Sequence, residues 1–496
     1  MTGISHLISK RAKSRQSSHF TNGPSEQPPK GFKPHEKPLL LSYGTPNDGF
    51  FPIDSIDVNL VEYPFEHQQK FNNSMENLSI SEKNPNSVHI ERHTKNPNLI
   101  DLSKGLQYVK VEGHDPLIEF TENFIKRTHP PNYDNWSSIL TTGASDGLNK
   151  ACDAILDPGD VILVEEFTFT PFLRFSDNSG AIPVPIKIDL SNDSNGIDLN
   201  YLENLLKNWD TTKLPKPKAL YTIATGQNPT GFTQTLEFRK KIYKLATDYD
   251  FIIIEDDPYG YLTLPKYQGP PKKNQFELKD QLTLEDYLTK HLTPSYLEID
   301  DVGRVIRVET FSKLFAPGLR LGFIIADKSI NLVIKNYAET VNRGSSGLAQ
   351  TVVNNVIQDK LGGVDGWLQW VLKMRATYSY RKDLLLQTIY ESKAYEKGLV
   401  DVIDPKAGMF VTLKIEFLKD DSDIILKMKE LLWKVISYGV SVVPGHNMTV
   451  DKEFSKSRSN FFRLCYAPAN NDYEIIESGK RLTDAILEFY ENGEKF

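Results

Sequence analysis

Short apolar runs alternate with amphipathic segments through the middle of this chain. The apolar runs occupy residues 138–143, 161–166, 219–224, 251–256, 304–312 and 322–327. Segments with helical periodicity follow several of them, as at residues 144–160 and 236–250. Strands that are apolar on both faces and alternate with helices are typical of a mainly parallel sheet covered on both sides. The pattern therefore predicts an α/β fold whose ligands bind at the carboxyl ends of the strands.

The C-terminal part of the chain predicts a second, smaller unit. A long helical pattern at residues 366–390 precedes short strand-like runs at 408–415, 439–445 and 461–467, which is typical of an α+β domain. We expect four parts along the chain. They are an N-terminal arm and linker at 1–37, a first part of the small domain at 38–97, a large domain at 98–360 that includes a polar insert at 266–301, and the rest of the small domain at 361–496.

Composition argues against several classes of protein. The formal net charge of -7 leaves no basic excess for a nucleic-acid partner. The two cysteines, Cys152 and Cys465, cannot form a disulfide framework, and no CxxC or Cys/His spacing indicates a metal. No run approaches the roughly 20 uncharged apolar residues that cross a bilayer. We expect no metal centre, no membrane span and no nucleic-acid partner, and the chain suits a reducing compartment.

The first 25 residues allow two interpretations. Lys10, Arg11, Lys13 and Arg15 are clustered, and no acid occurs before Glu26. This composition is typical of a mitochondrial transit peptide. The alternative is an arm of the fold, followed by a polar, proline-rich linker at residues 21–38.

A glycine turn between a predicted strand and a predicted helix is the first candidate site. Residues 141–150 read TTGASDGLNK, and Gly143 lets backbone amides approach an anion at the positive end of a helix. The same residues suit an ordinary capped helix with Ser145 as the N-cap and Asp146 in the first turn. The motif by itself is compatible with both interpretations.

Two further candidates follow other predicted strands. Asn228 lies in the NPTG turn of residues 224–231, where its amide can donate a hydrogen bond to a ligand oxygen. Asp256 is one of three acids that end an apolar run, and a buried carboxylate needs either solvent or a positive partner. The spacing of Asp256 and Tyr259 lets both side chains face one crevice.

Lys313 is the most unusual candidate because it lies in an apolar, turn-rich stretch, ETFSKLFAPGLRLGF. Thr310 and Ser312 place hydroxyls beside it, and Arg320 adds a guanidinium. Desolvation makes a lysine nucleophilic, which Schiff-base chemistry requires. A lysine on a solvent-exposed loop is the alternative interpretation.

The combination of these candidates is more specific than any one of them. An acid, an amide donor, a tyrosine, an anion cradle and a lysine, all at strand ends, match the needs of pyridoxal phosphate. That cofactor requires a lysine for covalent attachment, an acid at its ring nitrogen and a phosphate anchor.

On these residues the chain resembles the fold-type I, class I and II pyridoxal-phosphate aminotransferases. The runs YTIATGQNPTG, EDDPYGYL and VIRVETFSKLFAPGLRLGF carry the resemblance, which is strongest to the fungal aromatic amino acid aminotransferases of the catabolic, second-isozyme group. It implies a large domain with a mainly parallel sheet of the seven-stranded type and a smaller α+β domain.

The resemblance also implies a role for each candidate residue. Lys313 matches the lysine that forms the Schiff base and moves the proton. Asp256 matches the partner of the ring nitrogen, and Arg463 matches the arginine that binds the substrate α-carboxylate with its planar guanidinium. The other matches are Phe169, which stacks on the ring; Asn228 and Tyr259, which reach the phenolic oxygen; and Gly143, Ala144, Ser145, Thr310, Ser312 and Arg320, which surround the phosphate.

Two matches concern the subunit interface and the substrate pocket. Tyr108 matches a tyrosine that reaches the phosphate in the neighbouring subunit, which implies a homodimer with shared sites. Gly44 lies in a segment that lines the substrate pocket, together with Asn228. The residue before Gly44 is a tyrosine where the family often has glycine.

The expected function is transamination in the catabolism of aromatic amino acids. Phenylalanine, tyrosine and tryptophan are the expected donors, and 2-oxoglutarate or an aromatic 2-oxo acid is the expected acceptor, in a ping-pong cycle. Because LISKRAKSR resembles an arm of the same family, we favour a cytoplasmic enzyme over a processed mitochondrial one.

Several rival functions use the same residues. A 2-aminoadipate or kynurenine aminotransferase shares the pattern, as does a β-lyase or decarboxylase with the same cofactor. A ligand-sensing regulator on this fold would carry a DNA-binding domain, for which about 37 N-terminal residues are too few. A nucleotide-dependent dehydrogenase is disfavoured because no GxGxxG follows a predicted strand.

Overall fold

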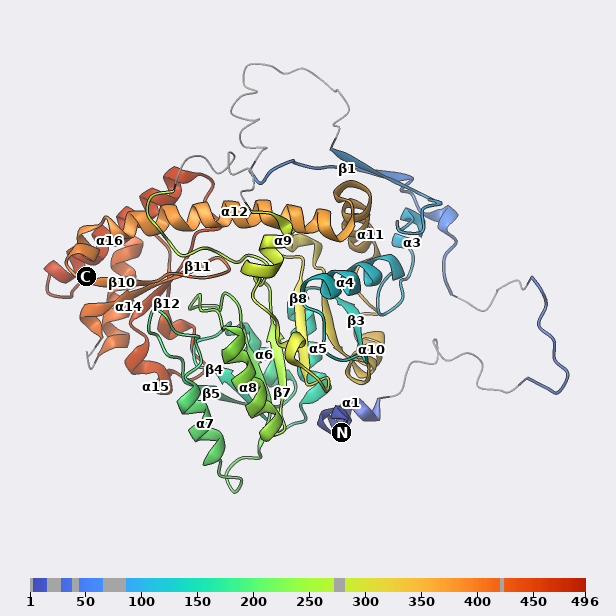
Figure 1. The fold of residues 1–496 in the computed structure, drawn as a ribbon, viewed down its shortest axis with the longest axis horizontal. Helices are drawn as coiled ribbons and strands as arrows, with labels where there is room; N and C mark the ends of the chain where they lie inside the picture. Colours follow the sequence, from blue (N-terminus) through green and yellow to red (C-terminus); the bar gives the residue numbers. More distant parts are fainter. Residues whose placement is uncertain (1–2, 16–27, 38–43, 66–85, 272–281, 420–422) are drawn as a thin grey trace, which may run out of the picture.

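A seven-stranded sheet forms the centre of the computed structural model, which describes residues 3–15, 28–37, 44–65, 86–271, 282–419 and 423–496. The strand order is β3-β9-β8-β7-β6-β4-β5, and in this sheet β9 runs antiparallel to both neighbours while the others share one direction. The predicted mainly parallel sheet is therefore confirmed (Figure 1). The strands are β3 (Trp136–Thr141), β4 (Val161–Glu165), β5 (Ile182–Ile186), β6 (Pro217–Thr222), β7 (Ile252–Asp256), β8 (Val305–Thr310) and β9 (Gly322–Asp327).

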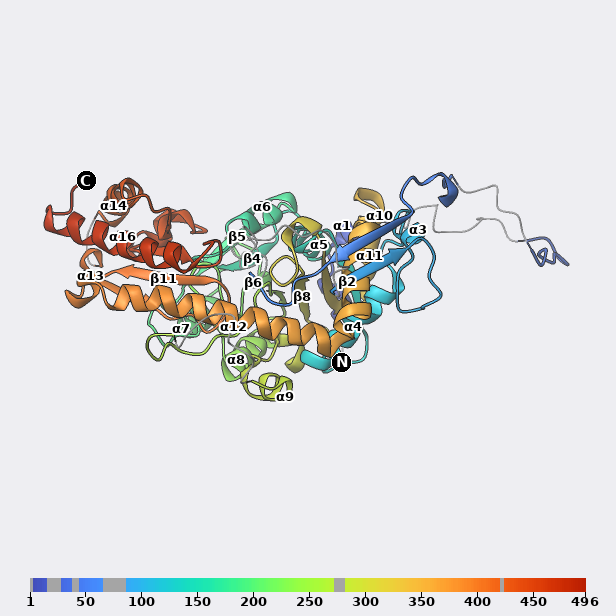
Figure 2. The same ribbon diagram turned by 90° about the horizontal axis from the view of Figure 1, so that it is seen from above.

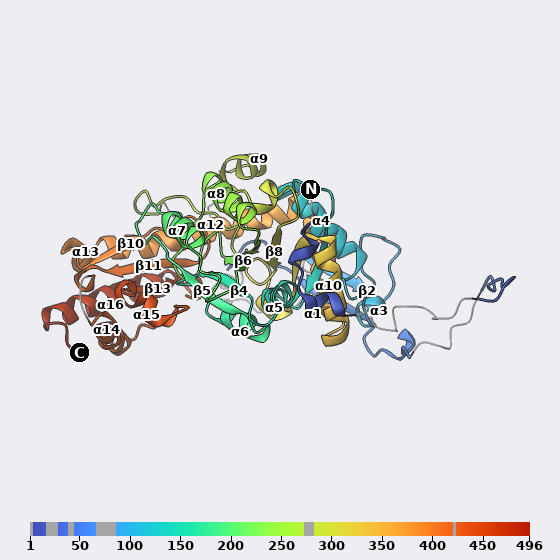
Figure 3. The same cartoon turned by 90° about the horizontal axis from the view of Figure 1, so that it is seen from below.

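Helices cover both faces of this sheet, as Figure 3 shows, and the predicted α/β class is confirmed. One face carries α5 (Ala144–Ile155), α6 (Pro171–Asn178) and α10 (Lys328–Val341). The other face carries α4 (Asp115–Thr128), α7 (Leu199–Lys207), α8 (Leu236–Asp248) and the N-terminal half of α12 (Gly363–Tyr390).

The alternation of side chains along the strands divides the core into two layers. On β7, Ile252 and Ile254 pack in the layer beneath α5 and α6, whereas Ile253 packs in the opposite layer. Successive residues of a strand point to opposite faces, so a continuous apolar run supplies both layers. The same alternation decides which polar side chains meet where β7 ends.

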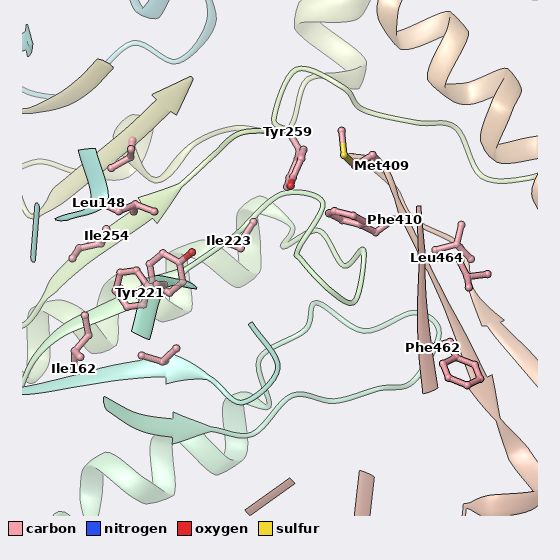
Figure 4. Packing of buried hydrophobic residues seen from close by; sticks show 14 of the residues in the cluster. Leu148, Ile162, Tyr221, Ile223, Ile254, Tyr259, Met409, Phe410, Phe462 and Leu464 are labelled. Carbon is pink, nitrogen blue, oxygen red and sulfur yellow. The ribbon is translucent and has the colours of Figure 1, made fainter. Parts of the chain in front are cut away.

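A smaller antiparallel sheet of order β10-β11-β13-β12 lies beside the large one. Helix α12 runs from this sheet to the far side of the large sheet (Figure 2). Apolar side chains from both sheets meet in one continuous core, with Tyr259 between them (Figure 4). The elements of this unit are β10 (Val400–Ile403), β11 (Phe410–Ile415), β12 (Val443–Pro444), β13 (Phe461–Cys465), α13 (Lys393–Glu396), α14 (Ile424–Ser437), α15 (Lys452–Ser455) and α16 (Asp472–Glu491).

The strand pair β1 (Ser55–Asn59) and β2 (Ser87–Glu91) lies at the opposite end of the molecule from the small sheet (Figure 1). Val88 and Ile90 pack there beside α3 (Leu102–Gly105), α11 (Gly347–Asn355) and the adjoining turn. The division of the chain into domains, with 38–97 in the small domain, stays a prediction. Residues 38–43 and 66–85 of that range lie outside the described residues, as do residues 21–27 and 38 of the predicted linker at 21–38.

The second half of the predicted polar insert is part of the packed structure. Tyr287 and Tyr296 are fully buried, close to the short helix α9 (Leu284–Asp286). Their hydroxyls donate hydrogen bonds to the Tyr261 carbonyl and to Gln234. The apolar periodicity is too short here to show in the sequence, because isolated aromatic residues provide the packing. Residues 272–281 lie outside the described part.

The N-terminal arm docks against α5 and α10 beneath the large sheet. Ile4, Leu7 and Ile8 are buried in the core, within and just after a short 3-10 turn that precedes α1 (Lys10–Ser14). The Ser9 amide donates to the Ala154 carbonyl at 2.8 Å. Residues 3–15 therefore belong to the folded body, as the arm interpretation requires.

Basic residues of the arm have acidic partners on α5. Arg15 forms a two-pronged ion pair with Asp153, and Arg11 lies 3.0 Å from the same carboxylate. The backbone amides of Lys10 and Arg11 donate to Asp157. Two of the four clustered basic side chains, Arg11 and Arg15, thus have an acidic partner within the fold. Among the described residues, no helix is long and apolar enough to span a membrane.

We expect Ile8→Ala to lower the free energy of unfolding by about 2–5 kcal/mol, because a buried side chain of the core is truncated. Lys13→Ala, at an exposed position of the same arm, is the control and should change it by less than about 0.5 kcal/mol. Urea denaturation of both variants measures the difference. Equal stabilities for Ile8→Ala and the parent protein would contradict the docking of the arm.

Candidate active site

One cavity collects most of the predicted site residues at the carboxyl ends of the central strands. Because β3, β4, β6, β7 and β8 point the same way, the loops that follow them open at one edge of the sheet. The cavity is lined by Ala144, Ser145, Leu148, Phe169, Ile223, Asn228, Asp256, Pro258, Tyr259, Thr310, Ser312, Lys313, Pro317 and Arg320.

A cradle for an anion lies where β3 passes into α5. Gly143 is the N-cap with φ 79°, and a Cβ atom there would lie 2.5 Å from an Arg320 guanidinium nitrogen. Only glycine therefore lets the guanidinium approach the helix N-terminus. Two sources of positive potential meet, the free amides of the helix and the arginine. The alternative with Ser145 as the N-cap is not the one observed.

Asp146 does not oppose an anion in this cradle. Its Oδ2 accepts hydrogen bonds from the Thr142 amide and from the Lys150 ammonium, at 2.8 and 2.7 Å. Lys150 is almost fully buried, so the two charges neutralise each other beneath the helix. The potential at the cradle is therefore determined by the helix amides and by Arg320.

The loop after β8 adds hydroxyls and the lysine. The Thr310 hydroxyl donates to the Ser312 hydroxyl at 2.8 Å, and the Ser312 amide donates to Thr310. Lys313 follows directly and lines the cavity at a half-buried position. The Leu314 carbonyl accepts a hydrogen bond from the Trp370 indole at 2.8 Å, which ties the loop to α12. The lysine is thus held on an anchored turn.

The three acids at the end of β7 separate to opposite faces of the sheet. Glu255 and Asp257 point to the face of Ile253, where Arg307 pairs with both and Arg239 pairs with Glu255. All four side chains are buried. Asp256 points to the face of Ile254, toward the cavity. Alternation along the strand therefore leaves one of three acids without an internal cation.

Asp256 is a buried carboxyl whose only hydrogen bond comes from a neutral donor, among the described residues. The Tyr221 hydroxyl donates to Oδ2 at 2.8 Å, and Oδ1 has no partner in the part of the chain that the structure describes. Burial raises the pKa of Asp256 to about 7, against the stabilising effect of the Tyr221 hydrogen bond. The Asp256 carboxylate can therefore pair with a positively charged group of a ligand in the cavity.

Arg463 reaches the site from the small sheet. It extends from β13, and its guanidinium carbon lies 4.5 Å from the centre of the Phe410 ring. Its Nη1 donates to the side-chain oxygen Oδ1 of Asn228 at 2.9 Å. Its Nε is buried and has no partner among the described residues. The planar guanidinium has no acidic partner in this part of the chain, so it can accept a carboxylate from a ligand.

Tyr259 connects the two units at the same place. It is buried, and its ring packs edge-on against Phe410 with centroids 5.8 Å apart. Figure 4 shows it between the residues of the large sheet and Met409 and Phe410 of the small one. Phe169 lines the cavity opposite, as a half-buried aromatic ring. Both line the same cavity as Asn228.

Four predicted residues are absent from the lining of this cavity. Gly143 and Arg463 adjoin the lining residues Ala144 and Asn228, whereas Tyr108 and Gly44 lie elsewhere. Tyr108 is exposed, and its neighbour Gln107 donates to the Pro46 carbonyl at 2.8 Å. Gly44 is exposed as well, with no atom within 4 Å of a Cβ built on it. Both lie near each other on the segment that carries the β1–β2 pair, outside the cavity.

The sequence reasoning missed Tyr221, which touches Asp256 from the neighbouring strand. Strand periodicity carries a signal for it, because Tyr221 and Ile223 share one face of the same run. The sequence does not show that this face adjoins Asp256, because the pairing of β6 with β7 is known only from the tertiary structure. The missed apolar lining residues are Leu148, Ile223, Pro258 and Pro317.

These groups fit pyridoxal phosphate, the cofactor that the sequence predicts. The cradle at Gly143 and Arg320 suits a phosphate, and the unpartnered Oδ1 of Asp256 suits a protonated ring nitrogen. Lys313 lines the same cavity between them. No group of three or more His, Cys, Asp or Glu side chains among the described residues has the arrangement to hold a metal ion.

Comparison with known proteins agrees with this site. Residues 73–477 match the family described as aminotransferase class I and II. Aromatic amino acid aminotransferase 2 of Saccharomyces cerevisiae is 38% identical over 92% of this chain and 91% of that protein. The crystal structure of the aromatic aminotransferase Aro9 from C. albicans is 65% identical with a TM-score of 0.91, over 100% of both chains. Aro8 from Candida albicans is 28% identical with a TM-score of 0.81, over 98% of each chain.

Asp256→Asn should make the free energy of unfolding of the cofactor-free protein depend less on pH. The carboxyl titrates near 4 when unfolded and at about 7 when folded, so the folded state binds more protons between those values. The parent protein therefore loses up to about 1.4 kcal/mol of stability per pH unit between pH 5 and 7, and the variant does not. Chemical denaturation at pH 5, 6, 7 and 8 measures this, with the exposed Asp134→Asn as control. If the free energies of unfolding of the parent protein and Asp256→Asn differed by the same amount at all four pH values, the assignment of this titration to Asp256 would be contradicted.

Proposed function

This chain belongs to the aminotransferase class I and II family, and from that membership we propose that it transfers the amino group of aromatic amino acids to a 2-oxo acid. Phenylalanine, tyrosine and tryptophan are the proposed donors, and 2-oxoglutarate or an aromatic 2-oxo acid is the proposed acceptor. The observation that carries the proposal is the meeting of Lys313, Asp256 and Arg320 in one cavity. The similarity to proteins named for aromatic substrates supports the choice of donor.

The cofactor is pyridoxal 5'-phosphate, which when bound accepts electrons from the substrate Cα into its protonated ring. The chain supplies the surroundings for that chemistry. Gly143, Ala144, Ser145, Thr310, Ser312 and Arg320 hold the phosphate through amides, hydroxyls and the guanidinium. Asp256 would keep the ring nitrogen protonated, Asn228 and Tyr259 would donate to the phenolic oxygen, and Phe169 would pack against the ring.

Lys313 would act through its ε-amino nitrogen, which would attach the cofactor at rest and move the proton during the reaction. A lysine can remove a proton only when it is neutral and close to the substrate, and the loop anchored by Trp370 holds it near the reacting atoms. Pro317 and Leu148 line the cavity beside it and reduce the access of water. Proton transfer is therefore confined to one group on one side of the cavity.

Arg463 orients the substrate by its α-carboxylate. The guanidinium is held by the Phe410 ring and by Asn228, so its two remaining nitrogens, Nε and Nη2, have a defined direction. A two-pronged pair with a carboxylate then aligns the substrate Cα with Lys313. The transamination cycle has two halves, and both the amino acid and the 2-oxo acid carry the α-carboxylate that this arginine binds.

The site is shared between two copies of the chain in this proposal. Tyr108 is exposed in a single chain. A tyrosine that binds the cofactor phosphate has to lie beside it, so Tyr108 would need the phosphate of another subunit. A homodimer would bring Tyr108 to the cradle of the neighbouring subunit and Gly44 to its substrate pocket. The exposed Phe50 and Ile53 lie on the same segment and would be covered by the same partner.

The proposed compartment is the cytoplasm. The basic N-terminus contributes Ile4, Leu7 and Ile8 to the core, so removal of a leader that included residues 3–15 would take buried side chains away from the large sheet. That packing favours an arm that is retained over a transit peptide that is cleaved.

A panel of donors and acceptors with purified, cofactor-loaded protein tests the proposed specificity. We expect kcat/KM for phenylalanine to exceed that for 2-aminoadipate and for kynurenine by at least about tenfold, because specificity is a ratio of these values. The 2-oxo acid product is measured directly by chromatography. Preference for 2-aminoadipate would replace the aromatic assignment, and release of ammonia or carbon dioxide without a matched oxo acid would indicate a lyase or decarboxylase.

Lys313→Ala should lower kcat by about 10²–10⁴-fold or more, because it removes the group that moves the proton. The visible absorbance of bound cofactor should also lose its lysine-dependent band. Lys240→Ala, at an exposed position of α8, is the control and should leave both readouts unchanged. Full turnover by Lys313→Ala would refute the assigned role.

Tyr108→Phe should weaken the binding of pyridoxal phosphate by about 10–100-fold, the loss of one hydrogen bond to a charged group. Because the residue is exposed in the single chain, the stability of the cofactor-free protein should not change. Equilibrium dialysis measures the Kd, and Tyr473→Phe, an exposed tyrosine on α16, is the matched control. Unchanged cofactor affinity, or a monomer in analytical ultracentrifugation, would count against shared sites.

A further inference from the structure

Tyr221 is the one described side chain that donates a hydrogen bond to Asp256, and it belongs to a different strand. It lies on β6, is fully buried, and its hydroxyl is 2.8 Å from Oδ2 of the carboxylate. The pairing of β6 with β7 places Tyr221 opposite Ile254, two residues before Asp256 on the same face. The contact is therefore determined by the register of the central sheet.

The ring of Tyr221 is held in one orientation. It stacks on Phe172 of α6 with the centroids 3.5 Å apart and the planes at 4°. Both rings are fully buried in the layer beneath α5 and α6. In the view of Figure 4, Tyr221 lies below Ile223 and Ile254. Because a stacked, buried ring cannot shift freely, the position of the hydroxyl oxygen is fixed.

Among the residues that the structure describes, no cation forms an ion pair with Asp256 that would compete with this hydrogen bond. The acids on either side of Asp256 along β7 are neutralised by Arg307 and Arg239 on the opposite face of the sheet. Asp256 itself has no ion pair within the described part of the chain, and the nearby Glu165 is another buried carboxyl. Glu165 accepts from Thr222 and Gln227, so it does not supply a proton to Asp256 through a direct contact. The neutral Tyr221 hydroxyl is therefore the described donor that sets the basicity of the Asp256 carboxylate.

We propose that Tyr221 is a positioning residue, whose hydroxyl occupies Oδ2 of Asp256, leaves Oδ1 for the ring nitrogen of the cofactor, and keeps the shared proton on that nitrogen. The inference rests on the proposed function, because it assumes that pyridoxal phosphate occupies the cavity. A hydrogen bond to a carboxylate stabilises its charged form and lowers its affinity for a proton. Without the donor, Asp256 becomes more basic, and the proton shifts from the ring nitrogen toward Oδ1. A less positive ring accepts electrons less readily.

Two substitutions change the strength of this donor in opposite directions. Tyr221→Phe removes the hydroxyl and keeps the stacked ring. Replacement of Tyr221 by 3-fluorotyrosine keeps the hydroxyl and makes it more acidic, so that it donates more strongly. The position of the proton is read from the 15N chemical shift of pyridoxal phosphate labelled at the ring nitrogen, bound to each protein at pH 7. Asp256→Asn provides the reference for a ring nitrogen without its counter-charge.

Tyr261→Phe is the matched control. Tyr261 is also buried and donates to a buried carboxylate, Glu309, at 2.8 Å. That carboxylate pairs with Arg307 on the face away from the cavity. Loss of this hydroxyl should therefore cost stability without changing the 15N shift, which separates a general effect of removing a buried tyrosine hydroxyl from an effect on Asp256.

We expect the 15N shift of Tyr221→Phe to lie between those of the parent protein and Asp256→Asn, and that of the fluorinated protein to move the other way. In steady state, kcat of Tyr221→Phe falls while KM for the amino acid changes little. A 15N shift equal to the parent value in both Tyr221 proteins overturns the inference, even if activity is reduced. If Tyr221→Phe does not fold, the fluorinated protein alone decides. If the parent protein binds no pyridoxal phosphate, the proposed function itself fails.

Discussion

A buried negative charge without an internal cation is the constraint on which this site depends. Three acids end β7, and the pleat of the strand sends two of them to a face where buried arginines pair with them. Asp256 is left on the other face with a neutral donor only, among the described residues. Burial of an uncompensated carboxylate costs several kcal/mol, which explains its raised pKa. The fold tolerates this cost at the position where the protonated ring of bound pyridoxal phosphate would neutralise the carboxylate.

The phosphate end of the cavity has the opposite imbalance. The α5 N-terminus and Arg320 place positive potential around Gly143 without an acid in front of them, because Asp146 turns back to Lys150. The two ends therefore complement a ligand that is negative at one end and positive at the other. Lys313 lies in the same cavity on a loop tied to α12. The arrangement explains why the resting site has polar atoms without partners in an otherwise well-packed core.

The small unit completes the site because its core is continuous with that of the large one. Arg463 reaches Asn228 across the junction, and Phe410 contacts both Arg463 and Tyr259. A shift between the units would move the carboxylate-binding arginine relative to Lys313. Packing at this junction, seen in Figure 4, is thus part of substrate alignment as well as of stability.

The sequence by itself determined the class of fold and most of the cavity. Apolar runs with polar ends predict strands whose loops gather at one edge, and residues such as Asn228, Asp256 and Lys313 follow those runs directly. The tertiary structure decided which neighbours these residues have. The β6–β7 register brings Tyr221 to Asp256, and the packing of isolated aromatic residues buries part of the polar insert. It also places Tyr108 on the surface. Local periodicity specifies the direction of a side chain along its own strand, whereas contact between strands depends on pairing that no single segment encodes.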